Sequence, residues 1–315
     1  MVSAVRTLVI GGGLRGLRTA LTHLPCAGGG TVRCIEAQPW PGDDVRSQRS
    51  NGFVCELGPF AFPPESLRRL VAPLSRPPKV VTAQVRDGSV FDGERHTATT
   101  LDVPPCSFAT GCEEVVQAYR RELGDVLMLG RAVTRIEPQR DGFTVVLGGE
   151  VETRMTAAQV VLAISPIAAA GVLGHFDPEL VTLHELAERD RRAFVWFGGL
   201  RQDAPELTGY GVLAADGLET ATRELIYCDR VFANRALDGR CLVRAELTLD
   251  ATDGDDRELA ARAAADLRRF TGTRARFGFV KVHRFETFAH GGVFAECHAR
   301  IADLAARLPG LSVAG

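Results

Sequence analysis

Residues 7–20 read TLVIGGGLRGLRTA, and the class of the fold follows from this stretch. An apolar run, Leu8–Ile10, leads into a glycine turn, and leucines at roughly helical spacing come after it. Gly11, Gly13 and Gly16 match the pattern G-x-G-x-x-G. In that pattern the first glycine allows a tight turn, the second lets the backbone approach a pyrophosphate, and the third lets the helix pack closely on the strand. The stretch therefore predicts a strand, a turn and a helix whose free N–H groups face the phosphates of a dinucleotide.

The residues that follow complete a β-α-β unit. Pro25–Gly30 is expected as a loop, and Thr31–Ile35 as a second strand. Glu36, at the end of that strand, is placed to accept a hydrogen bond from a ribose hydroxyl. An acidic residue there disfavours the 2′-phosphate of NADP. The alternative is a glycine-rich turn in an α/β protein that binds no ligand.

The composition is that of an ordinary globular protein, with 315 residues, 45% hydrophobic and 24% charged. This length allows two domains, or one large domain with an insertion. The net charge of −2 and the scattered arginines indicate no nucleic-acid partner and no anionic membrane surface. Every apolar run is shorter than a membrane span, and the first strand begins too near Met1 for a signal peptide.

Cysteine and histidine usage argues against structural metal. No C-x-x-C pair or zinc-finger spacing is formed by the eight cysteines, at positions 26, 34, 55, 106, 112, 228, 241 and 297. Several lie in apolar strand patterns, where cysteine behaves as a small hydrophobic residue. His283, His290 and His298 lack a carboxylate at ligand spacing. We therefore expect a reduced, cytoplasmic protein with no metal site.

Alternation and turn residues predict the remaining elements. Residues 126–147 look like an antiparallel meander, and Val160–Ile164 like a central strand buried on both faces. Short strands between residues 194 and 249 suggest a second sheet, and another strand is expected at Gly278–His283. Helices are expected at Glu113–Leu123, Pro178–Arg189 and Asp256–Phe270, the last because it is alanine-rich, acidic at its start and basic at its end.

Several stretches together carry a family resemblance. The order VIGGGLRGLRTA (9–20), VRCIEAQPWPG (32–42) and NGFVCELGP (51–59) resembles the opening of the flavin-dependent amine oxidase superfamily. The similarity is greatest to its protoporphyrinogen oxidase and phytoene desaturase-like branch. It continues through LMLGRAVTRIE, DGFTVVL, VVLAISPIAAAGVLG, VKVHRFETF and ARLPGLSVAG, and so spans most of the chain in order.

The resemblance implies an α/β fold in two parts. A Rossmann-like FAD-binding domain would be assembled from residues 1–62, 107–172 and 275–315. A substrate domain with a mixed or antiparallel sheet and a reduced cap would hold residues 63–106 and 173–274. No catalytic side chain is implied, because in such enzymes the flavin carries the chemistry.

The resemblance also assigns the residues near FAD. Those at the pyrophosphate turn and the adenosine would be Gly11, Gly13, Leu14, Arg15, Gly16, Glu36, Ala37, Val133 and Ala163. The residues nearer the flavin, or in the segments that hold its ribityl chain and diphosphate, would be Gly42, Arg46, Gly58, Pro59 and Gly315.

Four departures from the family weaken that assignment. Gly42-Asp43-Asp44 stands where the family has Gly-Gly-Arg, so a carboxylate replaces a cation near the diphosphate, a change on the order of a few kcal/mol. Arg46 could compensate from another angle. Cys112 stands at a helix start that is usually glycine, where its pKa could be lowered, although an incidental role is favoured. The span from Gly58 to Gly111 is short, which reduces the cap. If Gly315 is the natural end, part of the flavin clamp is absent.

Two hypotheses about function follow, and a third is weaker. The first is an FAD-dependent oxidoreductase that takes hydride from a C–H or N–H bond of an apolar small molecule, with dioxygen as a candidate re-oxidant. The second is a non-catalytic or weakly flavin-binding relative that acts as a binding or partner subunit. The third, an NAD-using enzyme, conflicts with the meander and the distal matches. The sequence leaves homo- or hetero-oligomer formation open.

Overall fold

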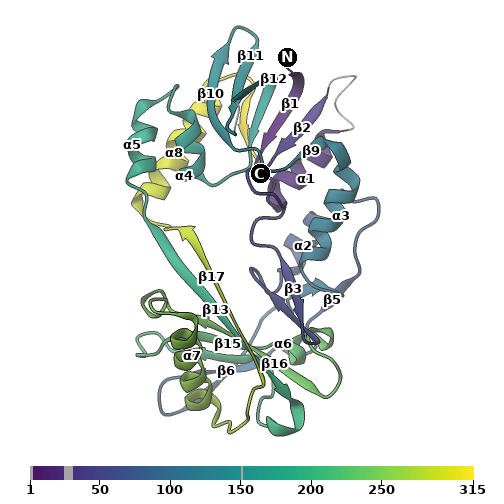
Figure 1. The fold of residues 1–315 in the computed structure, drawn as a ribbon, viewed down its shortest axis with the longest axis vertical. Helices are drawn as coiled ribbons and strands as arrows, with labels where there is room; N and C mark the ends of the chain where they lie inside the picture. Colours follow the sequence, from purple (N-terminus) through teal and green to yellow (C-terminus); the bar gives the residue numbers. More distant parts are fainter. Residues whose placement is uncertain (1–2, 25–30, 150–151) are drawn as a thin grey trace.

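Two seven-stranded sheets organise the chain in the computed structural model, which describes residues 3–24, 31–149 and 152–315. Figure 1 shows one sheet at each end of the molecule, with the long strands β13 (Arg189–Leu200) and β17 (Phe279–Phe288) running between them. The expected loop Pro25–Gly30, including Cys26, lies outside the described residues. Among the described helices, none is long and apolar enough to cross a membrane.

The first sheet confirms the predicted Rossmann-like unit and meander. Its strand order is β10-β11-β12-β1-β2-β9, with β18 also paired to β12. The parallel strands are β1 (Ser3–Ile10), β2 (Val32–Ile35), β9 (Leu127–Met128), β12 (Thr153–Leu162) and β18 (Leu311–Val313). The antiparallel strands β10 (Val133–Gln139) and β11 (Gly142–Leu147) extend it through the first half of β12. The second half of β12 pairs with β18, which brings the end of the chain beside the glycine turn.

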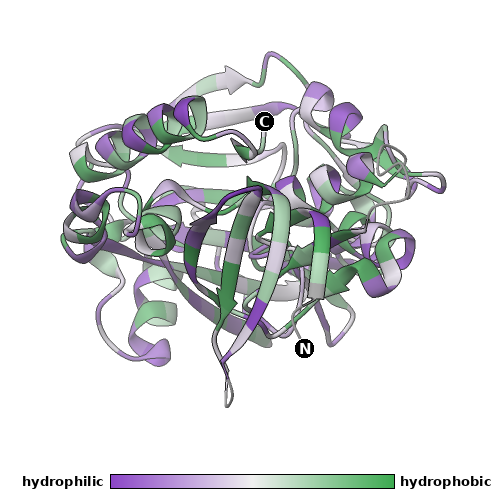
Figure 2. Cartoon of the chain, turned by 90° about the horizontal axis from the view of Figure 1, so that it is seen from above, coloured by the Kyte–Doolittle hydropathy of each residue, from purple (hydrophilic) through white to green (hydrophobic). Residues whose placement is uncertain are grey.

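Helices cover both faces of this sheet, so its central strands are apolar on both sides. On one face lie α1 (Leu14–His23), α2 (Pro64–Val71) and α3 (Glu113–Leu123), and on the other α4 (Pro166–Leu173), α5 (Pro178–Glu185) and α8 (Gly292–Arg307). Strand β1 shows the alternation, because Leu8 and Ile10 pack with the α4–α8 side and Val9 with the α1–α3 side. In Figure 2 the peripheral helices carry hydrophilic and hydrophobic residues in alternating bands.

The second sheet has the order β17-β13-β16-β15-β14-β6-β7. Its remaining strands are β6 (Asp87–Phe91), β7 (His96–Thr100), β14 (Gly211–Ala214), β15 (Thr222–Tyr227) and β16 (Arg240–Leu247). All its strand pairs are antiparallel except β6 with β14. Helix α7 (Asp256–Thr271) covers one face, and a capping box between Asp255 and Glu258 fixes its start.

Short elements lie between the two sheets or beside one of them. They are the hairpin β3 (Ser47–Ser50) with β4 (Phe53–Glu56), the pair β5 (Val80–Thr82) with β8 (Cys106–Phe108), helix α6 (Cys228–Val231), and 3₁₀ turns at Gly124–Val126, Arg201–Asp203, Ala233–Arg235 and Leu249–Ala251. The other face of the second sheet packs on this region through Phe53, Leu57, Phe60, Trp196 and Phe232.

Two expectations from the sequence need correction. The expected strand Gly278–His283 continues to Phe288, because residues 284–288 pair with Arg189–Ala193 of β13. The paired strands β13 and β17 are called the β13–β17 ribbon below. Its charged residues conceal the alternation of polar and apolar residues that would predict a strand. The expected helix Pro178–Arg189 ends at Glu185, and Arg189 is instead the first residue of β13. The division into domains stays a proposal, and α2 and α5 both pack against the first sheet.

Candidate functional site

The glycine turn between β1 and α1 has the geometry that a dinucleotide requires. Gly11 has a φ of +107°, and a Cβ there would lie 2.6 Å from the carbonyl oxygen of Ala163. A Cβ on Gly16 would lie 1.8 Å from the carbonyl oxygen of Gly11. At Gly13, in contrast, the nearest atom is 3.8 Å away, on Asp43. The first and third glycines therefore allow close packing, and the second leaves open space where a phosphate can approach the backbone.

The start of α1 has the features of an anion-binding helix N-terminus. Gly13 is its N-cap, no side chain caps it, and its first turn has no acidic residue. Glu36 lies beside this turn, and its carboxylate accepts hydrogen bonds from the N–H groups of Gly12 (2.6 Å) and Gln38 (2.7 Å). These contacts hold the carboxylate at the end of β2, where a ribose would lie. The residues present fit a dinucleotide with a free 2′-hydroxyl.

A cleft of about 700 Å³ runs from the glycine turn to the β13–β17 ribbon. Five of the predicted residues line it, namely Gly11, Gly13, Glu36, Arg46 and Ala163. The lining also contains residues that were not predicted, such as Trp40, Ser165, Arg189, His283, Phe285 and Phe288. Trp40 gave no signal in the sequence, because a separation of six residues in an irregular segment does not predict contact with Arg46. The guanidinium carbon of Arg46 lies 4.5 Å from the Trp40 ring centre.

The other predicted residues lie outside the cleft lining: Leu14, Arg15, Gly16, Ala37, Gly42, Gly58, Pro59, Val133 and Gly315. Two of them have a packing role. A Cβ on Gly42 would lie 2.6 Å from a methyl group of Val116, and one on Gly58 would lie 2.3 Å from the carbonyl oxygen of Asp44. Gly315 accepts a hydrogen bond from Arg18, on the helix of the glycine turn.

Asp43 and Asp44, which replace the family's cation, both line the cleft. Both side chains remain exposed to solvent, but the surrounding protein desolvates them in part. That desolvation raises the pKa of Asp43, and together with the charge of Asp43 it raises the pKa of Asp44 to about 6. Near the glycine turn the cleft therefore presents the carboxylates of Glu36, Asp43 and Asp44, and its lining also contains the guanidiniums of Arg46 and Arg189.

A buried ion pair between Glu56 and Arg235 lies behind the cleft, where sequence patterns gave no signal. Arg235 Nε lies 3.1 Å from Glu56 Oε1, and both side chains are almost completely buried. Glu56 also accepts hydrogen bonds from the hydroxyl of Ser47 and the N–H of Cys112. The Cys112 thiol is buried 3.3 Å from the hydroxyl of Ser107, and burial, with the charge of Glu56, raises its pKa. The idea of a lowered pKa at Cys112 is therefore wrong, because burial outweighs the helix start.

A second cavity, of about 830 Å³, borders the same segment, Leu57–Pro59, as the cleft. Leu57 lines the first cleft and Pro59 lines this cavity. Its walls come from residues 59–65, residues 101–105 and the second sheet, with Phe60, Phe62, Leu101, Val103, Tyr210 and Ile226 as the large apolar side chains. The cavity also contains the buried guanidinium of Arg244.

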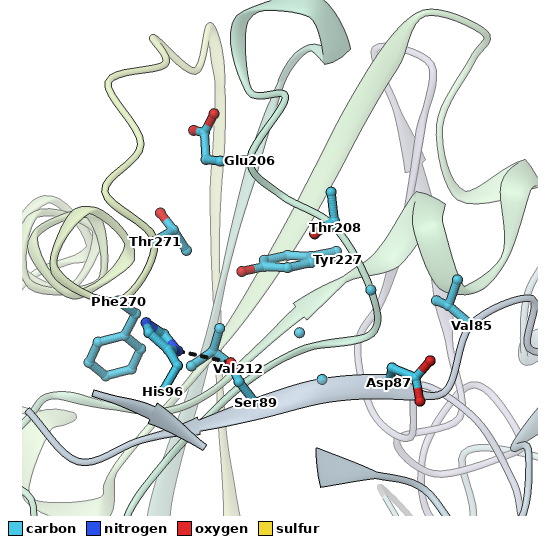
Figure 3. A pocket seen from close by; sticks show the side chains of 13 residues that line it. Val85, Asp87, Ser89, His96, Glu206, Thr208, Val212, Tyr227, Phe270 and Thr271 are labelled. Carbon is cyan, nitrogen blue, oxygen red and sulfur yellow. Dashed lines mark hydrogen bonds between the residues drawn. The ribbon is translucent and has the colours of Figure 1, made fainter. Parts of the chain in front are cut away.

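A third hollow, of about 570 Å³, lies between β6, β7, β14 and the end of α7 (Figure 3). Its histidine, His96, is already hydrogen bonded to the Ser89 hydroxyl at 2.9 Å. No residue that lines it also lines the first cleft. This hollow is therefore not part of the dinucleotide site.

Solved structures with similar folds cover nearly the whole chain. A proposed protoporphyrinogen oxidase from Exiguobacterium sp. 255-15 has a TM-score of 0.80 and 15% sequence identity, over 99% of this chain and 94% of that one. Putrescine oxidase bound to putrescine has a TM-score of 0.73 and 15% identity, over 99% and 93%. Reduced UDP-galactopyranose mutase has a TM-score of 0.75 and 11% identity, over 98% and 87%. At these identities the similarity establishes the fold.

The family follows from the sequence model of the flavin containing amine oxidoreductases, which matches residues 79–315. This match covers the meander, β12, the second sheet and β18, and so includes the five later stretches of the resemblance, from LMLGRAVTRIE to ARLPGLSVAG. It confirms FAD as the predicted cofactor. The chain belongs to the flavin containing amine oxidoreductase family.

Proposed function

We propose that this FAD-dependent oxidoreductase removes hydride from a C–H or N–H bond of an apolar small molecule. When bound, FAD supplies the acceptor for the two electrons and the proton, and dioxygen is the proposed final oxidant. The observation that carries the proposal is that two cavities border the same short segment, Leu57–Pro59. One has the glycine turn that a dinucleotide needs, and the other has apolar walls large enough for a small substrate.

The chain's own residues would bind and orient the two molecules. Gly13 and the start of α1 would hold the diphosphate, and Glu36 the adenosine ribose. Phe285 and Phe288 of β17 would exclude water from the part of the cleft furthest from the glycine turn. Gly58 and Pro59 would separate the flavin from the substrate cavity.

An absorbance spectrum tests this proposal most directly. Purified protein, with and without added FAD, is expected to show flavin absorbance close to one equivalent per chain. Candidate substrates should then bleach that absorbance in the absence of oxygen. Colourless protein that takes up no added FAD would contradict the proposal.

A second candidate function, a weakly flavin-binding partner subunit, is favoured by Asp43 and Asp44. Two carboxylates near a diphosphate oppose its binding. The double substitution Asp43→Gly and Asp44→Arg should then raise FAD affinity. An unchanged affinity would show that these carboxylates did not disable the site.

The setting of the protein is also a proposal. We infer a cytoplasmic location from the reduced cysteines expected from the sequence, and two domains with the boundaries given above. Whether the chain forms homo- or hetero-oligomers is a question for measurement of its mass in solution.

A further inference from the structure

Arg244 is a charged residue on an apolar face of the second sheet. Along β16, Cys241, Val243 and Ala245 pack toward α7, whereas Leu242 packs on the opposite face with Phe194 and Trp196. Because side chains alternate along a strand, Arg244 points to the same side as Leu242. It is 4% exposed there. A guanidinium is rarely buried this deeply unless a partner is present.

Within the described chain, that partner is missing. Neither Nε nor Nη1 of Arg244 has a hydrogen-bond partner, and no described carboxylate lies within 4.0 Å of its guanidinium. Its guanidinium carbon lies 3.7 Å from the centre of the Phe194 ring. That contact stabilises the charge but accepts no hydrogen bond in the plane of the guanidinium. Arg235 provides the contrast, since it is equally buried and has Glu56 and Ser107 as partners.

The cavity beside Arg244 can supply what the side chain lacks. Its lining combines large apolar side chains with two guanidiniums, those of Arg68 and Arg244, and four carboxylates, those of Glu65, Asp102, Glu224 and Glu246. Glu65 is paired with Arg69 at 2.8 Å, and Glu246 with Arg192 at 3.5 Å.

Glu224 has no ion-pair partner among the described residues. Burial, together with the charge of Glu246, raises its pKa. The charges of Arg244 and Arg223 act in the opposite direction, so Glu224 lies within the electrostatic reach of Arg244.

We propose that Arg244 binds the carboxylate of an otherwise apolar substrate. The inference rests on the proposed function, because it assigns the substrate class of that same site. A carboxylate accepts charge-assisted hydrogen bonds from a guanidinium, and Nε and Nη1 of Arg244 both have N–H donors without a partner in the described chain. The position also suits the reaction, since the charge of Arg244 acts on Asp44 and His283, which line the cofactor cleft.

The test compares two probes of the same shape, the anion 2-naphthoate and the neutral 2-naphthamide. Calorimetric titration of FAD-loaded protein is expected to show 2-naphthoate binding about tenfold more tightly or better. Arg244→Met should abolish this preference, and Arg244→Lys should retain part of it. Arg284→Met is the matched control, because Arg284 lies on the α7 side of the sheet and pairs with Asp256 at the surface. It should leave the preference unchanged.

Wild-type protein that binds both probes equally, or neither, would overturn the inference, as would a preference that survives in Arg244→Met. If Arg244→Met fails to fold, the wild-type preference and its decrease in Arg244→Lys still decide the matter. Flavin absorbance is measured in every sample. Loss of FAD with a retained carboxylate preference counts against the proposed function, and retained FAD without the preference counts against Arg244.

Discussion

Gly13 and Gly16 separate binding from packing within a single turn. The Cβ position of Gly13 is open, with Asp43 as its nearest neighbour at 3.8 Å, so Gly13→Ala should enter the space for the phosphate without a clash inside the protein. We expect FAD affinity to fall about tenfold or more with little change in melting temperature. Gly16→Ala should instead lower the melting temperature, because its Cβ would meet the Gly11 carbonyl. Fluorescence titration with FAD and thermal unfolding measure both effects. Equal loss of stability in the two variants would contradict this division.

Asp44 should make FAD affinity depend on pH. Its pKa is raised to about 6, so the side chain gains a proton as pH falls through that value and loses its repulsion of the diphosphate. Affinity should therefore rise between about pH 8 and pH 5. Asp44→Asn should bind FAD more tightly at the higher pH and show a flatter profile. His283, whose pKa is lowered by burial, also gains a proton in acid, so the difference between wild type and Asp44→Asn isolates Asp44. Parallel profiles would exclude its role.

At the scale of elements, the pair Glu56–Arg235 holds β4, β8 and the start of α3 together. Arg235 donates to the hydroxyl of Ser107 and carries the charge that Glu56 needs in a buried position. Arg235→Met leaves that carboxylate unpaired and should cost about 3 to 5 kcal/mol of unfolding free energy. Chemical denaturation measures this. The exposed pair Glu65–Arg69 is the control, and Arg69→Met should change stability by less than about 1 kcal/mol. A small effect of Arg235→Met would mean that Glu56 finds another partner.

The elements also show what could be predicted from the sequence. The glycine turn, the meander and helix α3 came from patterns confined to a few consecutive residues, and these were confirmed. The β13–β17 ribbon was predicted too short, because its charged residues meet only through pairing between positions about ninety apart. The two buried arginines were missed for the same reason. Burial at Arg235 and Arg244 depends on tertiary packing, which local periodicity does not report.

At the scale of the whole molecule, one cleft is lined by both sheets. Gly11 and Gly13 belong to the turn after β1, and His283 and Phe285 to β17 of the second sheet. A ligand that contacts both ends should therefore stabilise the two parts together. FAD at a hundredfold excess over its dissociation constant should add about 2.7 kcal/mol to the unfolding free energy.

ADP is the decisive comparison for that prediction. It retains the diphosphate and adenosine that the glycine turn and Glu36 would hold, but it lacks the flavin half that would reach β17. We expect ADP to raise the melting temperature less than FAD at equal saturation, because its contacts end at the first sheet. Phe285→Ala should reduce the FAD shift and leave the ADP shift unchanged, since this ring belongs to the second sheet. Equal shifts from ADP and FAD would mean that the flavin lies outside the cleft, and the two-cavity arrangement would then have no part in the chemistry.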